Sequence, residues 1–436
     1  MNWEIPLFIL PQNAIVKKQP NFLFHMVQIS MKRMNLEIPL FILPQNAIVK
    51  KQPNFLFHMV QISMKRMNFG RTALHIAAEH NRKETAELLI SHGANVNEKD
   101  NFGRTALHIA AEHNSKETAK LLISHGANVN EKDELGNTAL HIAAECNSKE
   151  TAELLISHGA NVNEKDNFGR TALHIAAECN SKETAKLLIS HGANVNEKDE
   201  LGNTALHIAA ECNSKETAEL LISHGANVNE KDNFGRTALH IAAECNSKET
   251  AKLLISHGAN VNEKDELGNT ALHIAAECNS KETAKLLISH GANVNEKDEL
   301  GNTALHIAAE CNSKETAELL ISHGANVNEK DNFGRTALHI AAECNSKETA
   351  ELLISHGANV NEKDNFGRTA LHYAVKNKSK EIVELLISHG ANINEKDELG
   401  NTALRKAAIF NSKKTAELLI SHGANINEKD EYGNTC

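Results

Sequence analysis

The chain has 436 residues, a formal net charge of −10 at pH 7 and 23% charged residues. Its length would accommodate two to four domains, while its acidic balance disfavours nucleic acid as a partner, because phosphate backbones bind cationic surfaces. The longest apolar runs, such as "IPLFIL", are far shorter than the roughly 20 residues of a membrane-spanning helix, so we expect no membrane span.

The segment 1–66 differs in composition from the rest of the chain. All six prolines and the only tryptophan, Trp3, lie there, together with eight Lys/Arg and two Asp/Glu. Glu4 stands where a signal peptide would carry a basic n-region, and Pro11 ends the apolar run early. We therefore expect an intracellular protein, located in the cytoplasm or alternatively in the nucleus, with a domain boundary before residue 67.

The opening segment also repeats. "HMVQISMKRMN" at residues 58–68 occurs first at 25–35, which is a 33-residue period. Codons that can encode this stretch, read from one base earlier, give "SHGANINEKD", which is the sequence of residues 421–430. The same shift converts residues 34–58 into "DELGNTALHIAAECNSKETAELLIS". We therefore interpret residues 1–66 as two out-of-frame copies of the repeat that follows, disordered or without function of their own. The alternative is a genuine folded or targeting leader.

Eleven units with the same period follow, from Met67 to Lys429, and residues 430–436 begin a truncated unit. In the unit 100–132, Thr105 can cap a short helix, and Asn114 or Ser115 can cap a second one. Gly126 then ends the second helix. Isolated helices below about 12–15 residues are marginal in water, so the units must stabilise one another by stacking.

The stretches "G.TALHIAA" and "E.A.LLI..GANVN" recur in register along the array, with substitutions in the last two units, and they resemble the ankyrin repeat over residues 67–429. The resemblance implies an all-α solenoid of stacked antiparallel helix pairs, with β-hairpin-like loops, here called fingers, that project outward. Ala106 stands where the family prefers Pro, and Asn114 where it prefers Gly. Neither should break the fold, because Ala favours helix and Asn tolerates the left-handed conformation. The last unit carries Arg405 and Lys406 and is typical of a cap.

Two residue types form ladders along the array. Seven cysteines recur from Cys146 to Cys344, ten histidines in "TALH" or its equivalent from His75 to His372, and eleven in "SHGAN" from His92 to His422. Equivalent residues of neighbouring units are about 8–10 Å apart, too far for one zinc ion or a disulfide. We expect free thiols and no metal or cofactor. By the resemblance, the first histidine row has a structural role beside the capping Thr.

Repetition argues against a single catalytic centre, so we expect no enzyme activity. The units differ mainly at the finger, "DNFGRT" against "DELGNT", just after the first helix, and within the second helix. Aromatic and Arg side chains are favoured interface anchors. The predicted protein-binding residues are therefore the Phe/Arg finger pairs: Phe102 and Arg104, Phe168 and Arg170, Phe234 and Arg236, Phe333 and Arg335, Phe366 and Arg368. The alternative is that Phe and Leu at this position only pack against the next finger.

The sequence thus predicts a monomeric, non-enzymatic scaffold that binds protein partners through its fingers and, as the resemblance implies, the concave face of its first helices. The alternative is a regulatory or substrate-adaptor subunit of an enzyme complex.

Overall fold

The computed structural model describes residues 69–429 and Gly433. The segment interpreted as out-of-frame repeats and the truncated last unit, apart from Gly433, lie outside the described residues. The chain divides into two units, residues 1–59 and 60–436, and the described residues all belong to the second.

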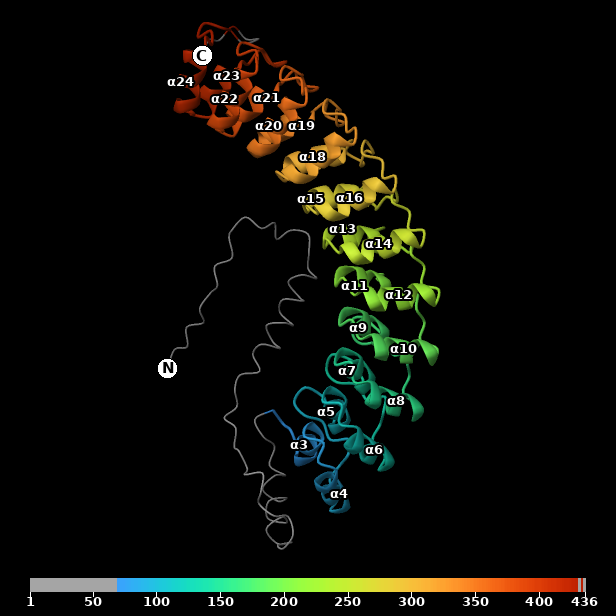
Figure 1. The fold of residues 1–436 in the computed structure, drawn as a ribbon. Coiled ribbons are helices and arrows are strands. Elements are labelled where there is room, and N and C mark those ends of the chain that lie inside the picture. The colour runs from blue at the N-terminus through green and yellow to red at the C-terminus, as the bar shows by residue number, and fades with distance from the viewer. Residues whose placement is uncertain (1–68, 430–432, 434–436) are drawn as a thin grey trace, which may run out of the picture. The chain divides into compact units, whose positions relative to one another are not determined.

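Each described repeat consists of two short helices, and residues 69–429 contain no strand. The first helices are α3 (Ala73–Glu79), α5 (Ala106–Glu112), α7 (Ala139–Glu145), α9 (Ala172–Glu178), α11 (Ala205–Glu211), α13 (Ala238–Glu244), α15 (Ala271–Glu277), α17 (Ala304–Glu310), α19 (Ala337–Cys344), α21 (Ala370–Lys376) and α23 (Ala403–Ile409). The second helices are α4 (Lys83–Ser91), α6 (Lys116–Ser124), α8 (Lys149–Ser157), α10 (Lys182–Ser190), α12 (Lys215–Ser223), α14 (Lys248–Ser256), α16 (Lys281–Ser289), α18 (Lys314–Ser322), α20 (Lys347–Ser355), α22 (Lys380–Ser388) and α24 (Lys413–Ser421). Figure 1 shows the pairs stacked in chain order, with the first helices in one layer and the second helices in the other.

Local residues set the ends of these helices as the sequence predicted. Thr105 is the N-cap of α5, and its backbone N–H donates to Nδ1 of His108, three residues on. Ser115 precedes α6, although its side chain makes no capping hydrogen bond. Asn114 connects the two helices in the left-handed conformation, with φ of 50°, and Gly126 leaves the second helix with φ of 85°. The expected left-handed use of Asn is therefore confirmed.

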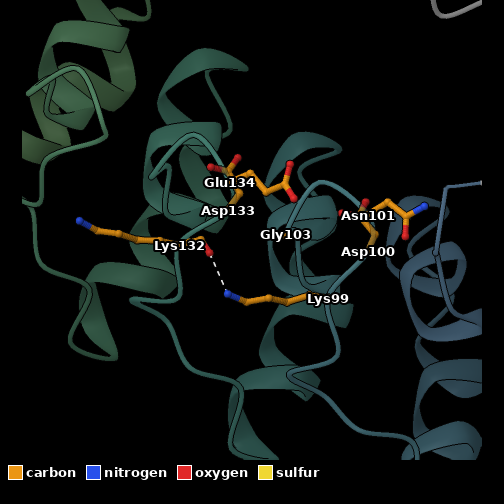
Figure 2. Close-up of a pocket in the computed structure, with 7 residues that line it drawn as sticks. All are labelled: Lys99, Asp100, Asn101, Gly103, Lys132, Asp133 and Glu134. Carbon is orange, nitrogen blue, oxygen red and sulfur yellow. Dashed lines mark hydrogen bonds between the residues drawn. The ribbon is translucent and has the colours of Figure 1, made fainter.

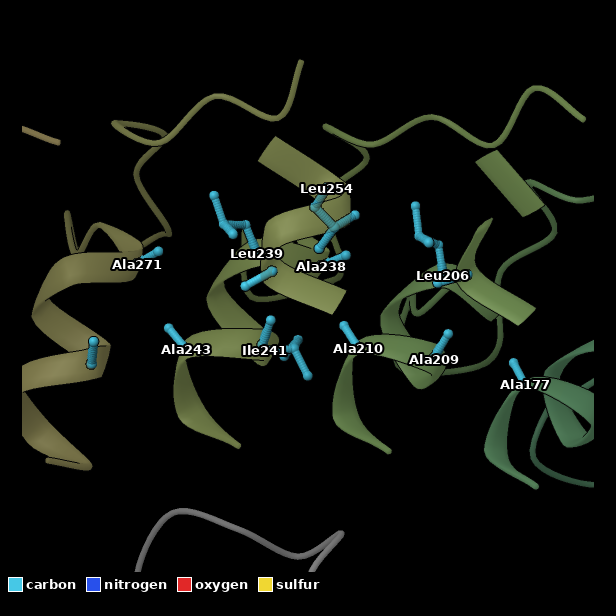
Figure 3. Close-up of a cluster of buried hydrophobic side chains, with 14 of the residues drawn as sticks. Ala177, Leu206, Ala209, Ala210, Ala238, Leu239, Ile241, Ala243, Leu254 and Ala271 are labelled. Carbon is cyan, nitrogen blue, oxygen red and sulfur yellow. The ribbon is translucent and has the colours of Figure 1, made fainter. Parts of the chain in front are cut away.

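Stacking supplies a continuous core between the two layers. In the pair α13 and α14, Ala238, Leu239, Ala243 and Leu254 are fully buried or nearly so. Figure 3 shows Leu239 and Ala243 in line with the equivalent Leu206 and Ala210 of the preceding pair. Alanines let neighbouring helices approach closely, and burying each leucine stabilises the fold by roughly 1.5–3 kcal/mol. Helices of seven and nine residues thereby persist through contacts with their neighbours.

The fingers are tight turns joined to one another along the stack. Within a finger, the N–H of Asp100 donates to the carbonyl of Arg104 (2.8 Å). Between fingers, the N–H of Glu134 donates to the carbonyl of Phe102 (3.0 Å), and Lys99 Nζ pairs with Glu131 (2.6 Å). Equivalent bonds recur in later repeats, so the fingers form a hydrogen-bonded row that fixes their spacing.

Candidate interaction surface

The structure brings the two members of each predicted Phe/Arg pair together. The guanidinium carbon lies over the ring of the Phe two residues earlier, at 5.2 Å for Arg104, 5.3 Å for Arg170, 5.2 Å for Arg236, 5.2 Å for Arg335 and 4.5 Å for Arg368. This is cation–π geometry. Four of these phenylalanines remain 44–50% exposed, and Phe168 is half-buried. Each finger pair therefore forms a preorganised aromatic and cationic unit at the surface.

The same arginines are also tied to carboxylates of their own repeat. Arg236 lies 2.8 Å from Asp232 at the start of the finger and 3.2 Å from Glu244 at the end of α13. Arg104, Arg170 and Arg335 make the equivalent pairs. We did not predict these ion pairs from the sequence. In each "DNFGRT" repeat whose first helix carries the Glu, however, the Asp stands four residues before the Arg and the Glu stands eight residues after it.

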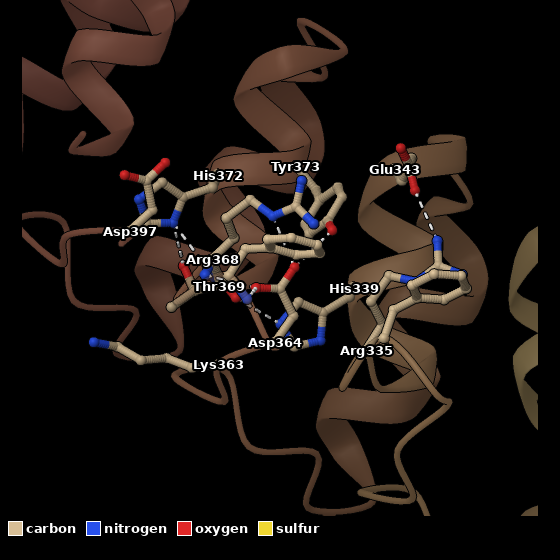
Figure 4. A network of polar contacts seen from close by, with 12 residues as sticks. Arg335, His339, Glu343, Lys363, Asp364, Arg368, Thr369, His372, Tyr373 and Asp397 are labelled. Carbon is tan, nitrogen blue, oxygen red and sulfur yellow. Dashed lines mark hydrogen bonds and ion pairs between the residues drawn. The ribbon is translucent and has the colours of Figure 1, made fainter. Parts of the chain in front are cut away.

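The repeat that contains α21 departs from this pattern (Figure 4). Lys376 replaces the glutamate, so Arg368 stacks on Tyr373 as well as Phe366, with its guanidinium 4.8 Å from the Tyr373 ring. The Tyr373 hydroxyl donates to Asp364 (2.7 Å), and burial together with that carboxylate raises the pKa of Tyr373. Lys376 in turn pairs with Glu343 of the preceding repeat (3.2 Å). The sequence signal for this network was the replacement of the usual Ile by Tyr.

The five predicted pairs do not form one patch. Of the four pairs that follow Phe102 and Arg104, only those of Phe333 and Phe366 lie in consecutive repeats. Phe168 and Phe234 are separated by a "DELGNT" repeat. Phe102 adjoins Phe69 of the first described finger, with ring centroids 5.9 Å apart, so the first finger extends this end of the surface. The site residues are therefore distributed along the finger row.

The first histidine row has the structural role that the resemblance implied. Because Nδ1 of His108 accepts from Thr105, the ring proton sits on Nε2, which donates to the carbonyl of Asn137 in the next finger (3.1 Å). Burial lowers the pKa of each of these histidines, to about 4 for His372. A buried neutral histidine thus connects each of these repeats to its successor.

The seven cysteines of the described repeats lie at the ends of the first helices, and no disulfide joins them. Burial and neighbouring glutamates raise the pKa of Cys212, Cys245 and Cys278 to about 12 and that of Cys311 to about 11. A thiol in this environment stays protonated and is a poor nucleophile or metal ligand.

The second histidine row is exposed, and each Nδ1 lies near the carbonyl four residues earlier, at 2.9 Å for His257. Within residues 69–429 and Gly433, no group of three His, Cys, Asp or Glu side chains is placed to hold a metal ion. No helix in this part of the chain has the length and apolar composition that a membrane span requires.

A hollow of about 490 Å³ opens between two successive fingers (Figure 2). It is lined by Lys99, Asp100, Asn101, Gly103, Lys132, Asp133 and Glu134. Lys99 Nζ reaches across it to the carbonyl of Lys132 (3.1 Å). Because equivalent lysines span later finger pairs, the hollow is the ordinary gap between fingers and not a distinct site.

The stacked helix pairs, the hydrogen-bonded fingers and the surface units along them define a repeat solenoid. The family model described as "Ankyrin repeats (3 copies)" matches ten overlapping spans from residue 45 to residue 430. The chain therefore belongs to the ankyrin repeat family, whose repeats are generally modules of protein–protein interaction. A comparison with curated proteins returned no match.

Proposed function

We propose that this ankyrin protein is a monomeric, non-enzymatic scaffold that binds a protein partner through its fingers and the adjoining first-helix face. The observation that carries the proposal is the set of exposed or half-buried Phe rings, each held against an Arg that forms an ion pair with the aspartate of its own finger. Side chains that are already ordered lose little entropy on binding. Aromatic and Arg side chains are also the residues that most often dominate binding energy.

Affinity capture with residues 67–436, followed by identification of the retained proteins, tests this proposal. Replacing Phe168, Arg170, Phe234 and Arg236 together by Ala should weaken capture. Because loss of each Arg leaves a buried Asp without its ion pair, a second variant should carry only Phe168→Ala and Phe234→Ala. The matched control, Lys186→Ala and Lys252→Ala, changes the second helices of the same repeats.

Circular dichroism should show that all three variants keep their helical content. Retained capture by the Phe variant would place the binding surface elsewhere on the chain.

We also propose that residues 67–429 are the functional array, that residues 1–66 have no specific function, and that the protein acts inside the cell. Out-of-frame codons would not have been selected for burial, capping or turns, and this segment contains all six prolines of the chain, a residue type that is unfavourable inside a helix. The gene should show one inserted or missing base near the codons for Met67 to Phe69. An uninterrupted frame there would contradict the proposal.

A further inference from the structure

In the Phe/Arg repeats, the chain's own arginine occupies a defined place on the surface. Arg236 lies between the Phe234 ring, 5.2 Å from the guanidinium carbon, and two carboxylates, Asp232 at 2.8 Å and Glu244 at 3.2 Å. We call this place the guanidinium slot. It is bounded by the fingertip side chain, the finger aspartate and the last residue of the first helix.

In the Leu/Asn repeats the same slot lacks a guanidinium. Asn269 stands at the place of the arginine, and its short amide reaches only Asp265 (3.3 Å). Asn302 likewise bonds Asp298 (3.0 Å). Glu277 and Glu310 retain the place of the second carboxylate, at the ends of α15 and α17. Residues 265–330 are the one stretch of the eleven complete units in which two Leu/Asn repeats are adjacent.

Where Asn replaces Arg, the neighbouring aspartate and isoleucine side chains are more exposed to solvent. Asp232 is 6% exposed beneath its arginine, whereas Asp265 and Asp298 are only half-buried. Ile241, in the first helix of the same Phe/Arg repeat, is also 6% exposed, whereas the equivalent Ile274 and Ile307 are half-buried. At the fingertips, Leu267 and Leu300 are 54% and 56% exposed. Two adjacent slots therefore present carboxylates beside aliphatic side chains that an arginine would cover.

The net charge of residues 265–330 also favours a positively charged ligand. Residues 265–330 contain eleven Asp/Glu, five Lys and no Arg, a formal net charge of −6, whereas the Phe/Arg repeat 232–264 contains four acidic and four basic residues. Cys278 and Cys311, next to the two glutamates, are neutral thiols. A cation that enters these slots meets unneutralised carboxylates.

We propose that residues 265–330 bind a partner segment whose arginine side chains enter the two open slots, as the chain's own arginines do elsewhere. This inference rests on the proposed partner-binding function of the same face and assigns the chemistry of the partner. Arg is specified because its planar fork pairs with two carboxylates and its faces pack on apolar side chains.

The stacking distance sets the spacing of those arginines. Neighbouring slots lie about 8–10 Å apart, which is one packed helix layer. An extended chain covers about 10 Å in three residues. The partner segment therefore has the form Arg-x-x-Arg in a polyproline II conformation, whose three residues per turn bring both arginines to the same face, with aliphatic residues between the arginines that contact Leu267 and Leu300.

The test uses the full chain and a fluorescent peptide with the core Arg-Leu-Val-Arg, and measures binding by fluorescence anisotropy. A matched peptide carries citrulline, which has the same shape without the charge, in place of both arginines. We expect the arginine peptide to bind and the citrulline peptide to bind at least about tenfold more weakly, since hydrogen bonds between charged groups are lost. Equal binding of the two peptides, or no binding of either, would overturn the proposal.

A second experiment fills the two slots with arginines of the chain itself. Asn269→Arg with Asn302→Arg recreates the residue found in the Phe/Arg repeats and should weaken peptide binding about tenfold or more while preserving the fold. The matched control, Asn137→Arg with Asn203→Arg, makes the same change in two isolated Leu/Asn repeats and should leave binding nearly unchanged. Glu277→Gln with Glu310→Gln should weaken binding without adding bulk.

Unchanged binding by the variant Asn269→Arg with Asn302→Arg would refute the slots as the site. The Phe168→Ala and Phe234→Ala capture experiment leaves residues 265–330 intact, so failure of the general binding function and failure of this inference give different results.

Discussion

At the scale of single residues, the buried histidine of each first helix links two repeats. His240 accepts a hydrogen bond from Thr237 on one ring nitrogen and donates to the carbonyl of Asn269 with the other (3.1 Å). The bond from Thr237 requires the neutral ring, because a protonated Nδ1 could no longer accept the Thr N–H, whereas Nε2–H can donate in either protonation state. The ten copies make the array sensitive to acid in a way that its net charge alone would not indicate.

We predict that the free energy of unfolding falls as the pH is lowered from about 7 to 5. Burial lowers the pKa of these histidines in the folded chain, so between their ordinary value of 6.5 and the folded value, about 4 for His372, the unfolded chain binds more protons. Stability is then lost as the pH falls, by up to about 1.4 kcal/mol per pH unit for each histidine.

Denaturant unfolding at several pH values between 7.5 and 5 measures this slope. Glutamates paired with lysines, such as Glu131, have a pKa lowered from 4.5 and contribute only in more acidic solution. A stability that stays constant down to pH 5 would contradict the prediction.

Residue identity also determined how much of the candidate surface was predictable. Phe102 and Arg104 are two residues apart in one turn, so their proximity could be read from the sequence. The pairing of Arg104 with Glu112 (3.5 Å) depends on the path of the chain from the finger into α5, which composition and periodicity do not give. The open slots required a comparison of side-chain exposure between repeats, and only the structure supplies it.

At the scale of elements, the turn between the two helices is built around a left-handed residue. This is Asn in ten repeats and Lys378, with φ of 58°, in the repeat of α21 and α22. The Asn side chain can also accept from a Thr in the second helix of the next repeat, as Asn213 does from Thr250 Oγ1 (3.1 Å). The Lys378 side chain has no oxygen that could accept a hydrogen bond from Thr415, the equivalent threonine of the next repeat. Thr415 instead accepts a hydrogen bond from the Ser412 hydroxyl.

We predict that Lys378→Asn stabilises the protein by about 1 kcal/mol. Asn tolerates the left-handed conformation better than Lys does, and its oxygen can accept from Thr415. The denaturant midpoint of the variant, compared with the unchanged chain at pH 7.5, measures the effect. The reverse substitution, Asn345→Lys in the preceding repeat, should destabilise the protein. If both variants match the parent, the left-handed turn does not limit stability.

Helix ends were the part of the fold that sequence predicted best, since Thr105, Asn114 and Gly126 act on their own backbone neighbours. The side-chain cap expected at Ser115 was the exception, because the α6 N-terminus forms without that hydrogen bond. The joining of fingers could not be predicted, because bonds such as Glu134 N–H to Phe102 connect residues of different units.

At the scale of the whole array, stability comes from contacts between neighbouring repeats, and no described helix pair depends on a distant one. Residues 199–264 repeat residues 133–198 without a single difference. Removing one of the two copies therefore joins surfaces that already meet in the intact chain.

We predict that deletion of residues 199–264 leaves a folded, shorter solenoid. The new neighbour of Lys198 is Asp265, which begins a Leu/Asn repeat, as Asp199 did before the deletion. Circular dichroism should show the same helical content per residue, and denaturant unfolding should remain cooperative. Deletion of 199–248 instead breaks the register of the repeats and serves as the destabilised comparison. Loss of structure in the in-register deletion would contradict nearest-neighbour stabilisation.

Because residues 133–198 and 199–264 are identical, the chain carries two copies of any binding site that lies within them. A ligand that recognises residues 133–198 meets the same side chains in the same arrangement at 199–264, so both copies have one intrinsic affinity. The two copies are offset by two packed layers, about 20 Å. A partner that carries two recognition motifs on a linker of that reach would engage both at a high effective concentration, and its overall affinity would exceed that of either motif without any new contact. The number of copies, and not a change of sequence, then sets how tightly such a partner is held.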